Sequence, residues 1–134
     1  MADLVGHLFF YRMSSRCRTL QALDSIIWLD PEVIVPGHGP ICGIEAAVAL
    51  KAYRECVGDE SRRCFGLGLS ALEAAKRIDL GPYGEWRCPA RLFANVESAY
   101  RDIRYETADA GRISKSSIEA MYEVAKARGL EVEF

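Results

Sequence analysis

The sequence contains no hydrophobic run long enough to cross a membrane and no segment typical of a secretion signal. Among its 134 residues, no apolar stretch approaches the roughly 18 residues that a membrane span needs. A charged-then-apolar leader followed by a small-residue cleavage site is also absent. We therefore expect a cytoplasmic protein with no membrane partner.

The chain also lacks a large charge of either sign. Its 17 Lys and Arg residues nearly balance its 19 Asp and Glu residues, which gives a formal net charge of −2. This balance gives no electrostatic reason to expect nucleic acid or an anionic membrane as a partner. With 50% hydrophobic residues, the composition is that of a soluble globular domain and not of a disordered chain.

Paired cysteines are missing as well. The five cysteines are odd in number and scattered, and no two of them form a Cys-x-x-Cys pair. This spacing argues against a zinc ribbon and against a thioredoxin-like redox site. We expect reduced thiols, most of them acting as small buried hydrophobic groups.

What the sequence does contain is a strand–helix–strand pattern in its first third. Residues 3–5 form a short candidate strand, and apolar positions at helical spacing predict a helix over about 16–29. The β-branched run Val33, Ile34 and Val35 then indicates a second, buried strand. Two strands joined by a helix form a βαβ unit with parallel strands and a right-handed crossover. The sequence therefore predicts an α/β fold that is mostly helical, with one parallel βαβ unit.

The rest of the chain is expected to be helical. A helix is predicted from Ile44 to about Cys56, with a continuation to Phe65 left open, and further helices over about 71–78, 89–105 and 116–129. Ser70 and Glu73 have the spacing of a capping box at the start of the second helix. Apolar residues expected to face the core include Val48 in the first helix and Ile118 and Tyr122 in the last. The chain thus divides into a βαβ unit at 1–42, a helical extension at 43–105, and a linker, terminal helix and short tail at 106–134. We expect all three parts to form one compact domain.

Both histidines of the chain follow the predicted strands. His7 comes after the first strand, and His38 lies in a Pro-Gly-His-Gly-Pro turn after the second. The glycines on both sides of His38 allow the backbone to take positive φ and to present the imidazole at the end of the strand. Open α/β sheets build their sites at the carboxyl ends of parallel strands. We therefore expect His7 and His38 to lie close together.

Residues 29–40, which read Leu-Asp-Pro-Glu-Val-Ile-Val-Pro-Gly-His-Gly-Pro, resemble the last metal-ligand motif of the metallo-β-lactamase-fold hydrolases. The resemblance runs from about residue 2 to residue 105, with further similar segments at 6–10, 69–75 and 80–83. It implies the C-terminal half of an αββα fold, followed by a helical extension found in part of the superfamily. In such enzymes a pair of metal ions holds a hydroxide that attacks a carbonyl, phosphoryl or related centre.

Two features differ from the family's pattern. The family's early His-x-His-x-Asp-His cluster is absent, and Gly6-His7 stands where the family has a Gly-Asp motif. The resemblance therefore implies zinc as the metal and His38 and His7 as its ligands, with Cys42 or Asp3 as a further candidate. A catalytic zinc needs about three protein ligands and an open position. We expect the isolated chain to bind zinc weakly or not at all, and to be inactive alone.

Cys42 lies four residues after His38, at the expected start of a helix. The positive end of a helix lowers the pKa of a nearby thiol, which would make Cys42 a metal ligand or a nucleophile. A buried, unreactive thiol is the alternative interpretation.

The resemblance leaves three functional hypotheses open. In the first, the chain is a truncated or remnant portion of a zinc-dependent hydrolase, active only when a complementary N-terminal half completes it. In the second, it is a non-catalytic module for interaction or self-association, and in the third it binds a small molecule. Half of a parallel sheet would leave apolar surface and open strand edges. We therefore expect either a homo-oligomer or a complex with a complementary polypeptide.

Overall fold

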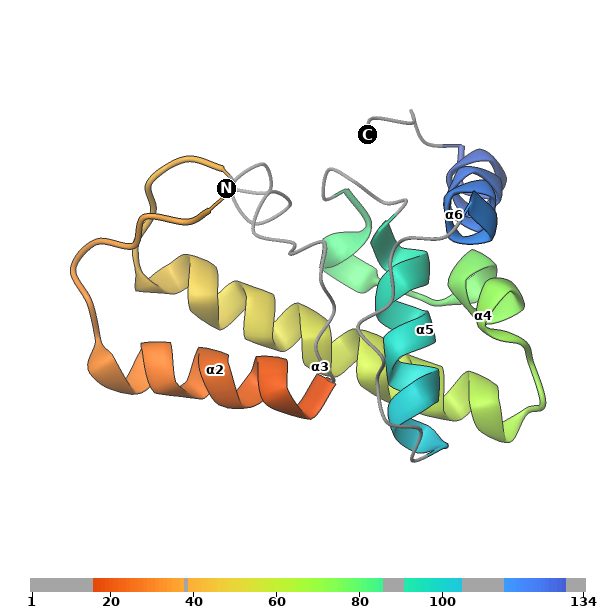
Figure 1. The fold of residues 1–134 in the computed structure, drawn as a ribbon, viewed down its shortest axis with the longest axis horizontal. Coiled ribbons are helices and arrows are strands. Elements are labelled where there is room, and N and C mark those ends of the chain that lie inside the picture. Colours follow the sequence, from red (N-terminus) through yellow and green to blue (C-terminus); the bar gives the residue numbers. More distant parts are fainter. Residues whose placement is uncertain (1–15, 38, 86–90, 105–114, 130–134) are drawn as a thin grey trace.

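The structure is a computed structural model of the chain, and it describes residues 16–37, 39–85, 91–104 and 115–129. The elements are α2 (Arg16–Leu29), α3 (Ile44–Gly66), α4 (Ala71–Arg77), the 3-10 helix η1 (Gly81–Glu85), α5 (Arg91–Ile103) and α6 (Lys115–Ala127). Figure 1 shows α2 and α3 side by side in opposite directions, with α5 crossing α3 steeply. Helices α4 and α6 lie at the end of the molecule farthest from the α2–α3 connection.

The predicted α/β fold with a parallel βαβ unit is wrong for the part of the chain that the structure describes. No element there is a β-strand, and residues 33–35 make one isolated antiparallel bridge, between Ile34 and Cys42. Val33 and Val35 are 60% and 75% exposed, so they do not belong to a buried sheet. The reason is that β-branched residues favour a strand only where a neighbouring strand pairs with them. Here the partner, Cys42, returns after the short connection 35–41, and a segment that returns through a short connection pairs antiparallel.

The first strand of the predicted βαβ unit, residues 3–5, lies outside the described residues. The proposed division of the chain at residues 42 and 105 stays a prediction.

Helix α2 confirms the helix predicted over about 16–29. Leu23 is buried, and Ile26 and Ile27 pack against the same core from one face of the helix. An ion pair between Lys51 Nζ of α3 and Asp24 Oδ1 of α2, 2.6 Å apart, joins the two helices at their surface.

Helix α3 is the longest element and the centre of the fold. It runs unbroken from Ile44 to Gly66, so the continuation left open by the sequence is present. Its buried residues recur every three or four positions, which is the spacing of a helix face turned toward a core. They are Ala46, Ala47, Leu50, Tyr53, Arg54, Val57, Gly58, Ser61 and Cys64. Val48, which the sequence suggested for burial, is exposed.

Helix α4 begins with the capping box that the sequence predicted. Ser70 Oγ accepts a hydrogen bond from the Glu73 N–H at 3.2 Å, and Glu73 Oε2 accepts one from the Ser70 N–H at 2.9 Å. These two bonds satisfy backbone donors that a helix start otherwise leaves without partners. The turn before the box places Gly68 at a φ of +76°, where glycine is favoured. The short α4 is thereby fixed at a defined point after α3.

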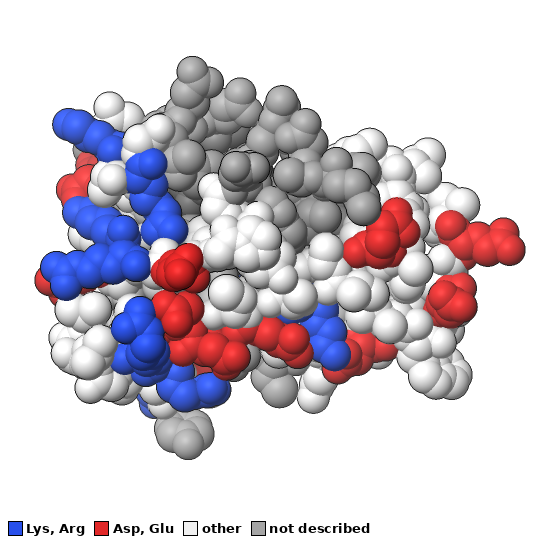
Figure 2. Space-filling view, turned by 180° about the vertical axis from the view of Figure 1, so that it is seen from behind, with Lys and Arg blue, Asp and Glu red and all other residues white. Residues whose placement is uncertain are grey.

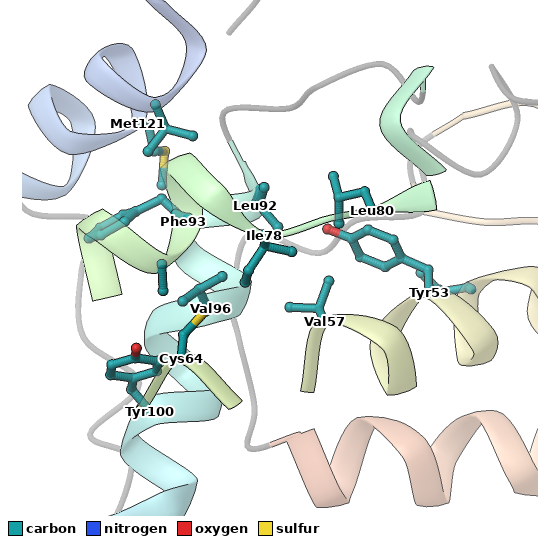
Figure 3. Close-up of a cluster of buried hydrophobic side chains, with 14 of the residues drawn as sticks. Tyr53, Val57, Cys64, Ile78, Leu80, Leu92, Phe93, Val96, Tyr100 and Met121 are labelled. Atoms are coloured by element: carbon teal, nitrogen blue, oxygen red, sulfur yellow. The ribbon is translucent and has the colours of Figure 1, made fainter. Parts of the chain in front are cut away.

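Helices α5 and α6 complete the core (Figure 3). Leu92, Val96 and Tyr100 lie on one face of α5 and are buried against α3 and α4. Met121 and Val124 of α6 close the far side of the same cluster. The predicted helical spacing of both segments is confirmed, although Ile118 and Tyr122 of α6, expected in the core, are exposed.

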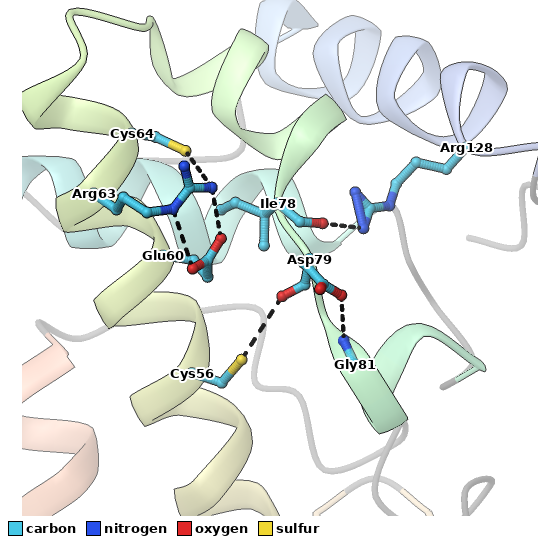
Figure 4. Close-up of polar contacts among 8 residues, drawn as sticks. All are labelled: Cys56, Glu60, Arg63, Cys64, Ile78, Asp79, Gly81 and Arg128. Carbon is cyan, nitrogen blue, oxygen red and sulfur yellow. Dashed lines mark hydrogen bonds and ion pairs between the residues drawn. The ribbon is translucent and has the colours of Figure 1, made fainter.

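Arg128 fastens the end of α6 to the end of α4 (Figure 4). Its Nη1 donates to the Ala75 carbonyl oxygen at 3.0 Å, and its Nη2 donates to that of Ile78 at 2.7 Å. Carbonyls in the last turn of a helix have no partner within the helix, so the guanidinium takes the role of a cap. Burial lowers the pKa of Arg128 from its ordinary value.

Candidate functional site

The segment that carries the Pro-Gly-His-Gly-Pro motif is the connection between α2 and α3, residues 30–43, here called the α2–α3 loop. Figure 1 shows it reaching out at the end of the molecule away from α4 and α6. Helix α2 stops at Asp30, whose φ of +47° lies in the left-handed region that non-glycine residues rarely adopt. Aspartate is one of the few residue types that tolerate this conformation. The loop therefore leaves the helix through a tight, defined corner.

A single backbone bridge holds the two arms of the loop together. The Ile34 N–H donates to the Cys42 carbonyl at 2.8 Å, and the Cys42 N–H donates to the Ile34 carbonyl at 3.0 Å. Side chains of both residues pack against the helical core. Since successive side chains of an extended segment point to opposite faces, Val33, Val35 and Ile41 face outward, and all three are exposed. The outward face of the α2–α3 loop is therefore apolar.

Two more exposed apolar residues lie at the end of α2, next to the loop in the chain. Trp28 is 83% exposed and Leu29 is exposed beside it in the chain, immediately before the loop. Single exposed apolar residues are ordinary, but several in neighbouring positions are typical of an interaction surface. We call Trp28, Leu29, Val33, Val35 and Ile41 the apolar end of the molecule.

Both predicted metal ligands, His7 and His38, lie outside the described residues, and so does the alternative ligand Asp3. Their predicted proximity stays a prediction. The backbone next to His38 agrees with the expectation from the sequence at one position, since Gly39 has a φ of +95°. Within the described ranges, no three His, Cys, Asp or Glu side chains come together as a metal site.

Cys42 does not have the properties of a reactive thiol. Burial, and after it the nearby carboxylate of Glu45, raise the pKa of Cys42 above its ordinary value. Its Sγ lies 3.9 Å from the Ile34 carbonyl oxygen. The proposed lowering of this pKa by the helix start is therefore wrong, because Glu45 occupies the first turn and accepts a hydrogen bond from the Gly43 N–H at 3.2 Å. Cys42 is a packing residue of the loop.

Charge is distributed unevenly between the two ends of the molecule. In Figure 2, Lys and Arg gather over the end formed by α4 and α6, whereas the opposite end shows acidic residues without them. Residues 19–50 contain no Lys or Arg, but four acidic residues: Asp24, Asp30, Glu32 and Glu45. Asp24 pairs with Lys51 and Glu45 bonds to the loop backbone, whereas Asp30 and Glu32 have no cationic partner among the described residues. Among the described residues, the apolar end is therefore rimmed by negative charge only.

A buried polar cluster between α3 and α5 was not predicted from the sequence. Arg54 donates from Nη1 to Asn95 Oδ1, and Asn95 Nδ2 donates to the Tyr53 hydroxyl oxygen at 3.1 Å. Burial raises the pKa of Tyr53 to about 12, although its hydrogen bond with Asn95 acts in the opposite direction. The phenol is therefore protonated near neutral pH and is no general base. Since all three residues are buried, we interpret the cluster as a hydrogen-bond network that joins α3 and α5 within the core.

A second group of polar residues lies between α3 and the segment after α4 (Figure 4). Cys56 Sγ lies 4.0 Å from the Asp79 carbonyl oxygen, and Arg63 Nη2 lies 2.9 Å from Glu60 Oε2. Burial is the main cause that raises the pKa of Cys56, and the carboxylates of Glu60, Asp59 and Asp79 raise it further. A thiol in this environment is a poor nucleophile. The contact between Cys56 and Asp79 joins the segment after α4 to α3, whereas the pair of Arg63 and Glu60 lies within α3.

No helix within the described ranges combines the length and the apolar character that crossing a bilayer requires. When the chain is compared with protein families, with curated proteins and with solved structures, nothing matches it.

Proposed function

We propose that the chain is a docking module related to the metallo-β-lactamase-fold hydrolases and has no catalytic activity alone. In this proposal the apolar end meets a complementary polypeptide, or an adjoining part of a longer chain, and His38 is presented at the junction as a metal ligand. The observation that carries the proposal is the outward apolar face of the α2–α3 loop, since the same loop holds the Pro-Gly-His-Gly-Pro motif.

The energetics of the apolar end support docking. Trp28, Val35 and the other residues of this end leave apolar surface in water, and burying such surface stabilises a complex by roughly 25 cal/mol per Å² before the costs of association. Trp is also among the residue types that contribute most at protein interfaces. The surface thus has the composition of an interface core.

The proposed role of zinc is limited by the available ligands. Cys42 packs against the core with its Sγ 3.9 Å from the Ile34 carbonyl oxygen, and Asp3 lies outside the described residues. His7 and His38 alone fall short of the three protein ligands of a catalytic site. The described residues therefore do not supply a complete zinc site, and we derive no catalytic step from one.

A homo-oligomer is the second candidate, because a second copy of the chain offers an equally apolar surface. The acidic rim disfavours it, since Asp30 and Glu32 of two copies would approach each other when two apolar ends meet face to face. We therefore place the complementary polypeptide first.

Calorimetry with zinc tests the metal-ligand role of the histidines. We expect the wild-type chain to bind zinc weakly and His38→Ala to lose this binding, with His7→Ala as the second ligand variant. Equal heats for wild type and His38→Ala would contradict the role of His38. The isolated chain is expected not to hydrolyse nitrocefin, a thioester or a phosphodiester, and turnover of any of them would contradict the docking module.

A further inference from the structure

The charge around the apolar end restricts what can bind there. All 17 Lys and Arg residues lie outside residues 19–50, and so do 15 of the 19 acidic residues. The apolar end thus belongs to a segment of purely negative charge, while the remainder of the chain is close to neutral. A partner that covers the apolar end meets Asp30 and Glu32 at its edge, and both carboxylates lack a cation among the described residues.

The backbone of the same loop is open on one side. The bridge between Ile34 and Cys42 uses the N–H and the carbonyl of Ile34. In an extended segment, backbone groups of successive residues point to alternate edges. Val33 and Val35 therefore direct their N–H and carbonyl groups away from Cys42, and these groups make no backbone–backbone hydrogen bond with described residues. An open edge of this kind is a template for one more strand.

We propose that the α2–α3 loop binds an extended segment of another polypeptide by strand addition, and that this segment carries Lys or Arg between apolar residues. Backbone hydrogen bonds at Val33 and Val35 would hold the added strand. Its apolar side chains would cover the apolar end, and its cations would face Asp30 and Glu32. The inference rests on the proposed function and names the chemistry of the partner.

Two synthetic peptides provide the probe. Both are capped octapeptides of alternating residues, one of Val and Lys and the other of Val and Glu. The readout is Trp28 fluorescence in a Trp86→Phe background, because Trp28 and Trp86 are the only two tryptophans and Trp28 is 83% exposed. Covering its ring shifts the emission to shorter wavelength. Circular dichroism checks that the variant folds like the wild type.

We expect the Val/Lys peptide to bind about tenfold more tightly than the Val/Glu peptide, because it forms several ion pairs where the other peptide adds like charges. The preference should disappear at about 1 M salt, where the Debye length is about 3 Å. Asp30→Asn combined with Glu32→Gln should also remove it, whereas Glu119→Gln on the exposed side of α6 should leave it unchanged. Equal binding of both peptides at low salt, or no shift of Trp28 with either, would overturn the proposal.

A third peptide tests strand addition itself. It is the Val/Lys peptide with N-methyl groups on alternate residues, which removes the hydrogen bonds of one edge and keeps the side chains. We expect it to lose the binding of the parent peptide, and undiminished binding would overturn strand addition. Self-association that buries Trp28 without any peptide, seen by sedimentation, would also overturn the proposal. The peptide titrations are made in buffer that contains a metal chelator, so failure of the zinc experiment and failure of this one are distinguishable.

Discussion

The helical core and the α2–α3 loop use apolar residues in opposite ways. In the core, Leu92, Val96 and Val124 are buried between helices, and the polar groups of Arg54 and Asn95 bond to each other. In the loop, Ile34 and Cys42 face the core while their neighbours in the chain face water. The difference indicates that the core stabilises the fold, and in our proposal the outer face of the loop serves recognition.

A matched pair of alanine substitutions gives the largest expected contrast between the two regions. Leu92 is 1% exposed, so Leu92→Ala should lower the free energy of unfolding by about 2–5 kcal/mol through lost burial and a cavity. Val35 is 75% exposed, so Val35→Ala should change it by less than about 0.5 kcal/mol. Urea denaturation of both variants measures the difference. Similar losses for both would contradict this distinction and show that Val35 stabilises the fold as a core residue does.

Alkaline pH should lower the free energy of unfolding through a group in the core, with little contribution from the α2–α3 loop. The Tyr53 hydroxyl has a folded-state pKa of about 12, above its ordinary value of 10, because burial disfavours the phenolate. Its contribution is therefore fully present below pH 10 and is lost as the pH rises from 10 to about 12, by roughly 2–3 kcal/mol.

Two variants separate the core contribution from that of the loop. Tyr53→Phe should lose less stability than the wild type across this alkaline range, as measured by denaturation at several pH values. Cys42→Ala, at the bridge of the loop, should keep most of the wild-type slope, because the Cys42 thiol is only partly buried and its raised pKa contributes less than that of the buried Tyr53 hydroxyl. A Tyr53→Phe variant with an unchanged slope would count against the buried phenol as the cause.

The helix caps give the smallest expected effect. Ser70→Ala should lower the free energy of unfolding by about 1 kcal/mol, because it removes the side-chain acceptor of the capping box at α4. Asp30→Gly is the matched change at the loop corner, and it should be neutral within about 0.5 kcal/mol, because glycine adopts the φ of +47° without strain. Thermal unfolding followed by circular dichroism compares them. A larger loss at Asp30 than at Ser70 would show that the corner stabilises the fold.

The sequence predicted the helices well because their signals are local. The capping box at Ser70 and Glu73, and the helical spacing of Leu92, Val96 and Tyr100, identify their elements within a few residues. The strand prediction failed at Val33–Val35 because a β-branched run does not say which segment it pairs with. Exposure of Ile118 and Tyr122 was missed for a similar reason, since which face of α6 meets α4 and α5 depends on packing between distant segments.

The position of the candidate site in the chain was predictable from the sequence, whereas its electrostatic properties were not predicted. The Pro-Gly-His-Gly-Pro turn identified the α2–α3 loop, and the positive φ of Gly39 agrees with its expected role. The raised pKa of Cys42 was missed because it depends on burial and on the orientation of Glu45. One signal was available and not used: the absence of Lys and Arg from residues 19–50 can be read from the sequence alone.

The contact between Arg128 and the end of α4 has a consequence for folding during synthesis. The Ile78 carbonyl receives its donor from a residue 50 positions further along the chain. While the ribosome is still making the chain, α4 therefore lacks its cap, and the cluster around Val96 lacks the cover that Met121 and Val124 provide. Folding is complete only after synthesis has passed Arg128. Until then the nascent chain exposes apolar surface of the kind that chaperones recognise.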